Sequence, residues 1–291
     1  MLVHIKDLVK DAKKNGYAIG AFNITNLESV LGVAQAAVKT NSPAIIQVSE
    51  SAIRYMGLKP ITHIVSTVAK NVATNVPIAL HLDHGTNFDN IFECINAGFS
   101  SVHIDASNLP LDENINLTKQ VVKVAHAKHV WVQGEVGAIV GSHDDITSKL
   151  KKIPLAKLDE VINFVIQTKV DTIAAAIGTA HGVHANENIV FSLLKAIKDK
   201  VKTPFVLHGG SGVLDAKIKK AIKEGVNIIN IGTDLKVAFC RTLIEVCLKS
   251  REETDPRNLL KPTIAAIKKV VSGKMKLFGS AGRAGGSKIE T

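Results

Sequence analysis

The sequence predicts a single-domain (β/α)8 barrel, and three observations lead to this fold class. Eight short apolar runs alternate with amphipathic stretches of helical period, the pattern of successive βαβ units around a buried parallel sheet. No GxGxxG follows the first run, although an open dinucleotide-binding sheet carries such a turn. A chain of 291 residues with 46% hydrophobic content can bury the core of one large barrel, although the length alone also suits two smaller domains. We expect the barrel and a C-terminal helix to occupy residues 1–284.

The eight apolar runs are the expected strands of this barrel. Each is short and rich in Ala, Ile and Val, as strands buried on both faces usually are. Pro77 and Pro204 stand at the start of their runs, where a missing N–H costs little. The runs cover residues 18–23, 44–49, 77–83, 101–105, 130–135, 172–178, 204–209 and 227–232.

The stretches between the runs indicate helices with recognisable ends. Asn87 or Asp89 is a candidate cap for a helix over 88–97. Asp215 is a candidate start for a helix over 216–224 that stops at Gly225.

Three other segments differ from this alternation. The first residues form an amphipathic stretch with acids among the lysines, which does not resemble a secretion signal. The connection over 138–154 has no convincing period and is predicted to be an active-site loop. A helix is expected after Pro256, and the polar end of the chain, 279–291, is expected to be flexible, with 285–291 outside the barrel.

Charge and cysteine content restrict the possible partners. The net charge is +10, but the 36 Lys and Arg are scattered, so we expect an anionic substrate such as a phosphate and no nucleic acid. No stretch reaches the roughly 18 apolar residues of a membrane span. The three cysteines form no CxxC pair, which argues against a disulfide framework and favours a cytoplasmic location.

Polar residues that end the predicted strands form the expected active site, because parallel barrels place their chemistry at the carboxyl ends of strands. His84, His181 and His208 follow the third, sixth and seventh runs. Three converging histidines with open coordination positions build a catalytic zinc site. The other strand-end residues are Asn23, Ser49, Asp83, Asp105, Glu135 and Asn230.

The remaining histidines are expected to have other roles. His81 and His103 lie inside predicted strands and are interpreted as core residues, while His184 remains a candidate to support the metal ligands. Four others are interpreted as surface or packing residues: His4, His63, His126 and His129.

Glycine-rich turns follow the last two strands. HGGSG over 208–212 and NIGTD over 230–234 place backbone N–H groups and hydroxyls where barrels commonly bind a phosphate. Gly182 beside His181 adds a further glycine at the same end.

Several motifs together resemble class II, metal-dependent ketose-bisphosphate aldolases. They are GYAIGAFNITNLE, HLDHG, AGFSSVHIDAS, IGTAHG, LHGGSG, INIGTD and DPRN, and the likeness runs in order and spacing from about residue 1 to 284. The resemblance implies a (β/α)8 barrel, bound zinc, and reversible cleavage of fructose or tagatose 1,6-bisphosphate to dihydroxyacetone phosphate and glyceraldehyde 3-phosphate. A lysine imine would be the other route to this chemistry, but no predicted strand ends on lysine.

The resemblance also implies roles for individual residues. His84, His181 and His208 match the zinc ligands, and Asp105 and Glu135 match carboxylates that support the metal or hold it in an alternative position. The residue that exchanges a proton at the bond that breaks is matched by Asp83.

Substrate-binding roles follow from the same likeness. Gly182, Gly209, Ser211 and Thr233 match the site for the phosphate of dihydroxyacetone phosphate, with Asn230 on its hydroxyls. Carbonyls near Gly182 and Gly210 match a site for a monovalent cation, Na⁺ or K⁺. Asn23 and Ser49 match the aldehyde half, and Arg257 matches an arginine that reaches the far phosphate from a neighbouring subunit, which implies a homodimer or homotetramer.

The sequence departs from the family pattern at two places. The loop glutamate that delivers a proton in the family is replaced by His143, so we expect His143 or Asp144 to take over, with Asp145 as a third candidate. Gly232 stands where fructose-specific relatives often carry Asp or Asn; fructose is favoured as the commoner assignment, and tagatose 1,6-bisphosphate stays open.

Two other classes of function also stay open. On the same barrel, a metal-dependent hydrolase would activate water and release no triose phosphate. A non-catalytic sugar-phosphate-binding protein would bind its ligand without turnover.

Overall fold

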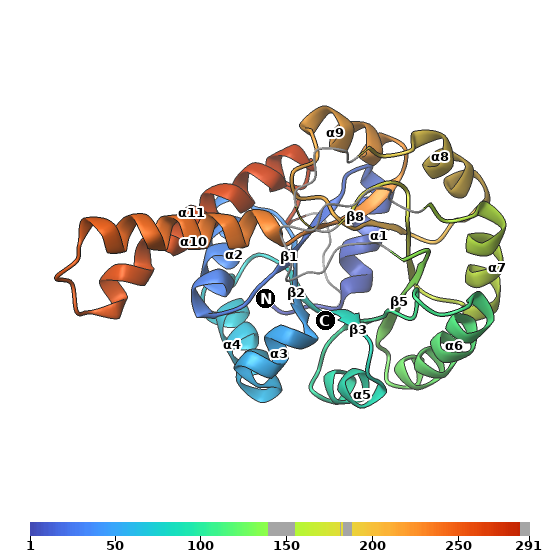
Figure 1. The fold of residues 1–291 in the computed structure, drawn as a ribbon, viewed down its shortest axis with the longest axis horizontal. Coiled ribbons are helices and arrows are strands. Elements are labelled where there is room, and N and C mark those ends of the chain that lie inside the picture. Colours follow the sequence, from blue (N-terminus) through green and yellow to red (C-terminus); the bar gives the residue numbers. More distant parts are fainter. Residues whose placement is uncertain (139–154, 181, 183–187, 286–291) are drawn as a thin grey trace.

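The computed structural model describes residues 1–138, 155–180, 182 and 188–285, and its strands close into one parallel barrel. Each strand pairs with its neighbours in chain order, and β8 returns to β1 (Figure 1). The strands are β1 Ile19–Asn23, β2 Ala44–Ser49, β3 Ile78–Gly85, β4 Ser101–Ile104, β5 Trp131–Val136, β6 Thr172–Ala175, β7 Phe205–Leu207 and β8 Val226–Ile231. The predicted (β/α)8 barrel and its eight strands are confirmed.

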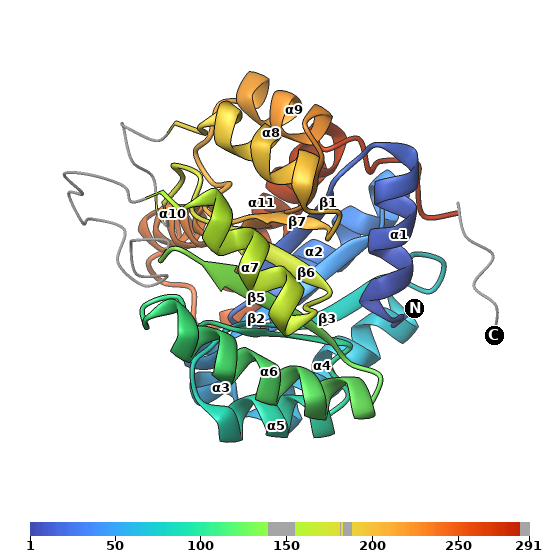
Figure 2. The same cartoon turned by 90° about the vertical axis from the view of Figure 1, so that its right-hand side faces the viewer.

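Helices surround the barrel between successive strands (Figures 1 and 2). They are α1 Ile5–Asn15, α2 Leu27–Thr40, α3 Glu50–Met56, α4 Leu58–Asn71, α5 Phe88–Asn96, α6 Leu111–Ala127, α7 Leu158–Thr168, α8 Phe191–Lys200, α9 Asp215–Lys223, α10 Thr233–Lys249 and α11 Pro256–Leu277. Among the described residues no helix is long and apolar enough to cross a bilayer.

Helix α1 packs against the inward-facing side chains of the barrel. Its buried Ile5, Leu8 and Val9 form one apolar cluster with strand residues that include Ile45 and Ile228. Burying this face removes apolar surface from water and fills the barrel end from which the strands start. The chemistry is therefore left to the opposite end, where the strands finish.

The predicted helix caps were partly right. Asn87 caps α5 through its side chain, which accepts the backbone N–H groups of Asp89 and Asn90. Asp215 is already the first residue of α9, and the cap position belongs to Leu214, whose side chain cannot accept a hydrogen bond. The prediction that Asp215 precedes the helix was wrong by one residue; its carboxylate lies in the first turn, where the helix dipole favours it.

The end of the chain differs from expectation over 279–285. Ser280 is fully buried, and its hydroxyl accepts a hydrogen bond from that of Ser42 at 2.8 Å. The backbone N–H groups of Gly282 and Ala284 donate to the carbonyls of Thr40 and Asn41. These bonds fix the segment to the end of α2, so it is part of the folded barrel. Of the predicted tail over 285–291, residues 286–291 lie outside the described residues.

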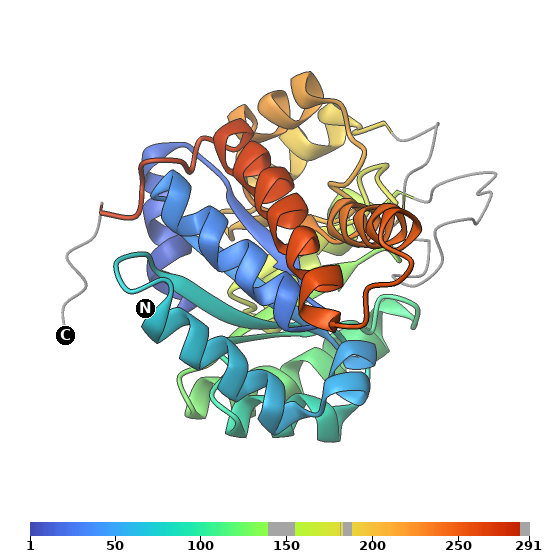
Figure 3. The same ribbon diagram turned by 90° about the vertical axis from the view of Figure 1, so that its left-hand side faces the viewer.

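Helices α10 and α11 form an antiparallel arm that extends beyond the barrel wall. The turn between them is the part of the molecule farthest to the left in Figure 1. The later part of α11 returns to the barrel and packs along α2 (Figure 3). Ile267 of α11 contacts Gly32 of α2 so closely that a Cβ at Gly32 would lie 2.6 Å from it.

Candidate metal centre

A bulge between β3 and β4 shapes the centre of the site. Leu82 pairs with Val102 and Gly85 pairs with Ile104, so two residues of β3, Asp83 and His84, oppose the single residue His103. Bulges of this kind bend a strand and redirect its side chains, often next to active sites. His84 has a φ of 48°, in the left-handed region that a residue with a Cβ rarely adopts.

Four side chains converge beside this bulge. His84, His103, Glu135 and His208 each offer a nitrogen or oxygen atom, and these atoms all lie within 4.8 Å of one another. They come from β3, β4, β5 and the residue after β7, so strands far apart in the sequence supply one cluster. His103, Glu135 and His208 are buried.

His84 is oriented by the carboxylate of Asp105. Its Nδ1 lies 2.5 Å from Asp105 Oδ2, and its Nε2 lies 2.9 Å from His208 Nδ1. Burial alone would lower the pKa of His84, but the carboxylates of Asp83 and Asp105 outweigh it and raise the pKa to about 10. Burial would likewise raise the pKa of Asp105, but its hydrogen bond and attraction to His84 hold that pKa far below its usual value.

The carboxylates of Asp105 and Glu135 are linked through one hydroxyl. Ser107 Oγ lies 2.7 Å from Asp105 Oδ1 and 3.1 Å from Glu135 Oε1. Glu135 Oε2 lies 3.9 Å from His208 Nδ1. The backbone carbonyl of Glu135 accepts a bond from Asn114 Nδ2, so both the main chain and the side chain of this strand end are fixed.

Asp83 lies next to the cluster, with no solvent exposure. Its Oδ1 is 3.8 Å from His84 Nε2. Side-chain amides of Asn23, Gln47 and Asn230 point nitrogen atoms at its oxygens, at 2.7, 3.3 and 3.5 Å. A buried carboxylate is costly unless hydrogen bonds compensate for lost water, and these amides provide that compensation while fixing its orientation.

The turns after β7 and β8 meet at the same end of the barrel. Gly209 has a φ of 65° and a Cβ there would lie 2.2 Å from the carbonyl oxygen of Ala180. The N–H of Gly210 donates to the carbonyl of Asn230, and the N–H of Asp234 donates to Ser211 Oγ. Glycines therefore allow three loops to approach closely at the start of α10, where backbone N–H groups favour an anion.

The structure thus brings most of the predicted site residues together. His84, His208, Asp105, Glu135, Asp83, Asn23 and Asn230 surround the bulge, and Gly209, Gly210, Ser211, Gly232 and Thr233 form the adjoining turns. Gly182 is buried with a φ of 105°. His181, His184, His143, Asp144 and Asp145 lie outside the described residues.

Two predicted residues are less directly connected to this group. Ser49 ends β2 beside Asp83, but its hydroxyl caps α3 by accepting the N–H of Ala52 at 3.3 Å. Arg257 belongs to the first turn of α11 and its guanidinium donates to Asp255. It lies just after the turn at the tip of the arm, away from the barrel.

Sequence reasoning missed several polar residues of the site. His103 was interpreted as core; it is buried as expected, but its ring faces the metal-ligand candidates. The side-chain nitrogen of Gln47 contacts Asp83. That of Gln133 lies 2.7 Å from His208 Nε2. Alternation within each strand could have identified them, because every second residue of a barrel strand points inward.

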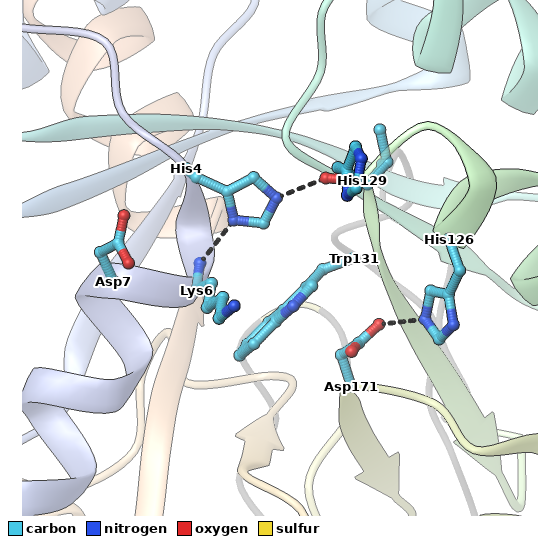
Figure 4. Close-up of a pocket in the computed structure, with 8 residues that line it drawn as sticks. His4, Lys6, Asp7, His126, His129, Trp131 and Asp171 are labelled. Carbon is cyan, nitrogen blue, oxygen red and sulfur yellow. Dashed lines mark hydrogen bonds and ion pairs between the residues drawn. The ribbon is translucent and has the colours of Figure 1, made fainter. Parts of the chain in front are cut away.

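A hollow lies at the opposite end of the barrel from the metal centre, where β5 and β6 begin. It encloses about 440 Å³ and is lined by His4, Lys6, Asp7, His126, His129, Val130, Trp131 and Asp171 (Figure 4). Two contacts lie within this lining: His4 Nε2 bonds the carbonyl of His129, and His126 Nε2 bonds Asp171. The first contact joins the start of α1 to the segment just before β5, and the second joins α6 to the residue before β6. These are packing contacts, as expected for His4 and His126.

The residues beside the bulge fit a divalent cation. Two imidazole nitrogens only 2.9 Å apart, His84 Nε2 and His208 Nδ1, need a proton or a cation between them. The pairing of His84 Nδ1 with a carboxylate is the usual support of a metal-bound histidine. His84, His208 and Glu135 would hold the ion among the described residues, and imidazole with carboxylate is a donor set typical of catalytic zinc sites.

The fold and this cluster define a metal-dependent barrel enzyme. The sequence model described as "Fructose-bisphosphate aldolase class-II" matches residues 3–283. The chain therefore belongs to the class II fructose-bisphosphate aldolase family, whose members are metal-dependent lyases.

Individual relatives agree with this assignment. A fructose-bisphosphate aldolase of Geobacillus stearothermophilus is 39% identical over 285 residues, covering 97% of this chain and 99% of that protein. One from Staphylococcus aureus is 40% identical with the same coverage. The crystal structure of the YdjI aldolase from Escherichia coli K12 has 32% identity and a TM-score of 0.85, covering 98% of this chain and 100% of that one.

Proposed function

We propose that this protein reversibly cleaves fructose 1,6-bisphosphate to dihydroxyacetone phosphate and glyceraldehyde 3-phosphate, with zinc as its resident cation. One observation carries the proposal: the buried Asp83 carboxylate lies 3.8 Å from His84 Nε2, at the edge of the cluster of imidazoles and carboxylates. Cleavage of a β-hydroxy ketone requires a base for the hydroxyl proton and a cation for the ketone oxygen, and this arrangement would supply the two side by side. The names of the relatives support the choice of substrate.

Asp83 acts as the base in this proposal. Cleavage removes the proton of the C4 hydroxyl as the C3–C4 bond breaks and a carbonyl forms at C4. An ionised carboxylate is an acceptor only, and three amides hold Asp83 in one orientation. In the direction of synthesis, the same carboxyl group returns the proton to the new hydroxyl, as general acid–base catalysis requires.

The cation site complements this base. When bound, a divalent cation supplies a Lewis acid for the ketone oxygen at C2, where negative charge develops during cleavage. We assign the coordination to His84, His181 and His208, with Glu135 and Asp105 in support. Zinc is the cation that we favour, because imidazole and carboxylate ligands suit it.

The glycine turns bind the substrate in this proposal. Gly182, Gly209, Ser211 and Thr233 bind the phosphate next to the ketone, and Asn230 contacts its hydroxyl groups. Support comes from the closeness of the turns after β7 and β8 and from the start of α10 beside them. Carbonyls near Gly182 and Gly210 would hold Na⁺ or K⁺, and Asn23 with Ser49 would contact the aldehyde half.

The remaining proton is assigned to the loop after β5. The carbon released as a carbanion must be protonated, and His143 or Asp144 is proposed to deliver that proton. His143 stands in the sequence where the family carries its loop glutamate, and Asp144 is the residue after it. Alanine at each position should lower turnover, and unchanged turnover in both variants would count against this assignment.

We also propose that the enzyme is a cytoplasmic homodimer. Arg257 lies in the first turn of α11, just after the tip of the arm, and its side chain is 88% exposed. Ile244 and Leu248 on α10 are 58% and 62% exposed. A second subunit packed on α10 would cover this apolar surface and bring Arg257 to the far phosphate of the partner's substrate.

A coupled assay for triose phosphates tests the proposed activity. Fructose 1,6-bisphosphate and tagatose 1,6-bisphosphate are supplied separately to the zinc-loaded enzyme, the chelator-treated enzyme, and the Asp83→Asn variant. We expect faster cleavage of the fructose substrate, loss of activity with chelator and recovery with zinc. Asp83→Asn should lower turnover by about 100-fold or more while zinc still binds.

Each alternative gives a different result in this assay. Faster cleavage of tagatose 1,6-bisphosphate would replace the proposed substrate with its C4 epimer. Release of inorganic phosphate without triose phosphate would indicate a hydrolase. Binding of either sugar without turnover under any metal would leave a sugar-phosphate-binding protein.

A further inference from the structure

His103 is the member of the cluster to which neither the strand-end pattern nor the family resemblance gives a role. It has no solvent exposure. Its ring centre lies 4.7 Å from that of His84 and 5.3 Å from that of His208. Its Nε2 has no hydrogen-bond partner among the described residues, yet lies 3.7 Å from Glu135 Oε2. The ring could therefore be either a metal ligand or a support for the ligands.

The hydrogen bond at the other ring nitrogen decides between these roles. The backbone N–H of His84 donates to His103 Nδ1 at 3.2 Å. A ring nitrogen that accepts a hydrogen bond carries no proton, so the neutral imidazole must carry its proton on Nε2. That Nε2–H has no lone pair to offer a cation, and it faces the carboxylate of Glu135 as a donor.

The bulge explains why this backbone bond is needed. Since Asp83 and His84 together oppose His103, the N–H of His84 has left the regular β3–β4 ladder. A buried backbone N–H requires a partner, and His103 Nδ1 replaces the carbonyl that the ladder no longer supplies. The bond also secures the left-handed backbone of His84 (φ 48°), on which the direction of its imidazole depends.

We propose that His103 is a positioning residue of the metal centre: Nδ1 holds the backbone of His84, and Nε2–H orients the Glu135 carboxylate. His103 thus fixes two ligands without binding the cation itself. The inference rests on the proposed function only in requiring that a divalent cation binds beside the bulge, and it holds whichever bisphosphate is the substrate.

Three substitutions separate the two contacts. His103→Asn retains an acceptor near the position of Nδ1 and loses the donor toward Glu135. His103→Gln retains an N–H near the position of Nε2 and loses the acceptor for His84. His103→Leu removes both. Zinc affinity, measured by competition with a chelating dye, should fall about tenfold for Asn and for Gln and up to about 100-fold for Leu.

The number of imidazoles on bound zinc distinguishes support from ligation. X-ray absorption spectra of the zinc-loaded enzyme should show the same number in the wild type and in the Asn and Gln variants. One imidazole fewer in these variants would overturn the proposal, because His103 would then be a ligand. Wild-type zinc affinity in His103→Leu would also overturn it.

His81→Asn is the matched control. His81 is a buried histidine of β3 whose Nδ1 lies 2.9 Å from Ser101 Oγ, and the cluster of four does not include it. We expect near wild-type zinc affinity, and a loss equal to that of His103→Leu would contradict a specific role for His103. If the Leu variant fails to fold in circular dichroism, the Asn and Gln variants still decide. If the wild-type protein binds zinc normally but cleaves neither sugar, the proposed function is rejected and the inference about His103 still stands.

Discussion

His84 is held by more contacts than its position at a strand end would suggest. Its backbone N–H bonds His103, its Nδ1 faces Asp105, and its Nε2 faces His208. The nearby carboxylates raise its pKa to about 10, so without a cation the ring is protonated at neutral pH. The proton and the cation therefore compete for the same space.

This competition predicts how metal binding depends on pH. Because a bound cation must displace the proton of His84, the apparent zinc affinity should rise by roughly tenfold per pH unit between pH 7 and 9. Titration calorimetry in buffers with different ionisation enthalpies should show about one proton released per zinc at pH 8. Affinity that does not change with pH would contradict the protonated state of His84.

The same shift has a consequence for the stability of the metal-free protein. The folded-state pKa lies above the ordinary value of 6.5, so protonated His84 stabilises the fold fully below about pH 6.5. That contribution is lost as the pH rises toward about 10. Metal loading removes this dependence because the cation replaces the proton.

At the scale of elements, turns decide the shape of the site. The bulge in β3 sets Asp83 and His84 together opposite His103 at the carboxyl end of the barrel. The turn after β7 passes so close to Ala180 that only glycine fits at position 209. Both features belong to the backbone, and the side chains of the site depend on them for their direction.

Gly209→Ala tests this dependence. The substitution adds a Cβ 2.2 Å from a backbone oxygen at a φ of 65°, which should cost about 1–3 kcal/mol in the free energy of unfolding. Urea denaturation measures the change. Gly273→Ala is the matched control, because a Cβ there meets nothing within 4 Å in α11 and should stabilise the helix by about 0.5–1 kcal/mol. Equal effects at the two positions would refute the close approach after β7.

At the scale of the whole molecule, α1 and the arm have different tasks. Helix α1 fills the end of the barrel from which the strands start, so substrate reaches the strands only at the other end. The arm of α10 and α11 extends away from the barrel. Two apolar side chains of α10, those of Ile244 and Leu248, remain more than half exposed on it.

Leu248→Glu tests whether this arm joins two subunits. Burying a leucine side chain contributes about 1.5–3 kcal/mol, so a charge there should weaken the dimer at least about tenfold. Light scattering coupled to size-exclusion chromatography measures the mass against concentration. Ile166→Glu on α7, at a residue that is 69% exposed, is the matched control and should leave the mass unchanged. A wild-type protein that is monomeric at all concentrations would remove the basis of the dimer proposal.

The sequence by itself determined the barrel, the order of its strands and the residues at their ends. Short and nearly continuous apolar runs identify strands, because each strand must bury both faces between the helices and the barrel interior. His84, His208, Asp105 and Glu135 were predicted as one group because carboxyl ends of parallel strands share one face of the barrel.

Only the tertiary structure decided what each inward-facing side chain meets. His103 looks like any buried strand residue in the sequence, and its role depends on the bulge that sets two residues of β3 against it. The contacts of Gln47 with Asp83 and of Ser280 with Ser42 join residues distant in the chain. Register and bulges arise from packing among several strands at once, and a linear pattern of residue types does not record that packing.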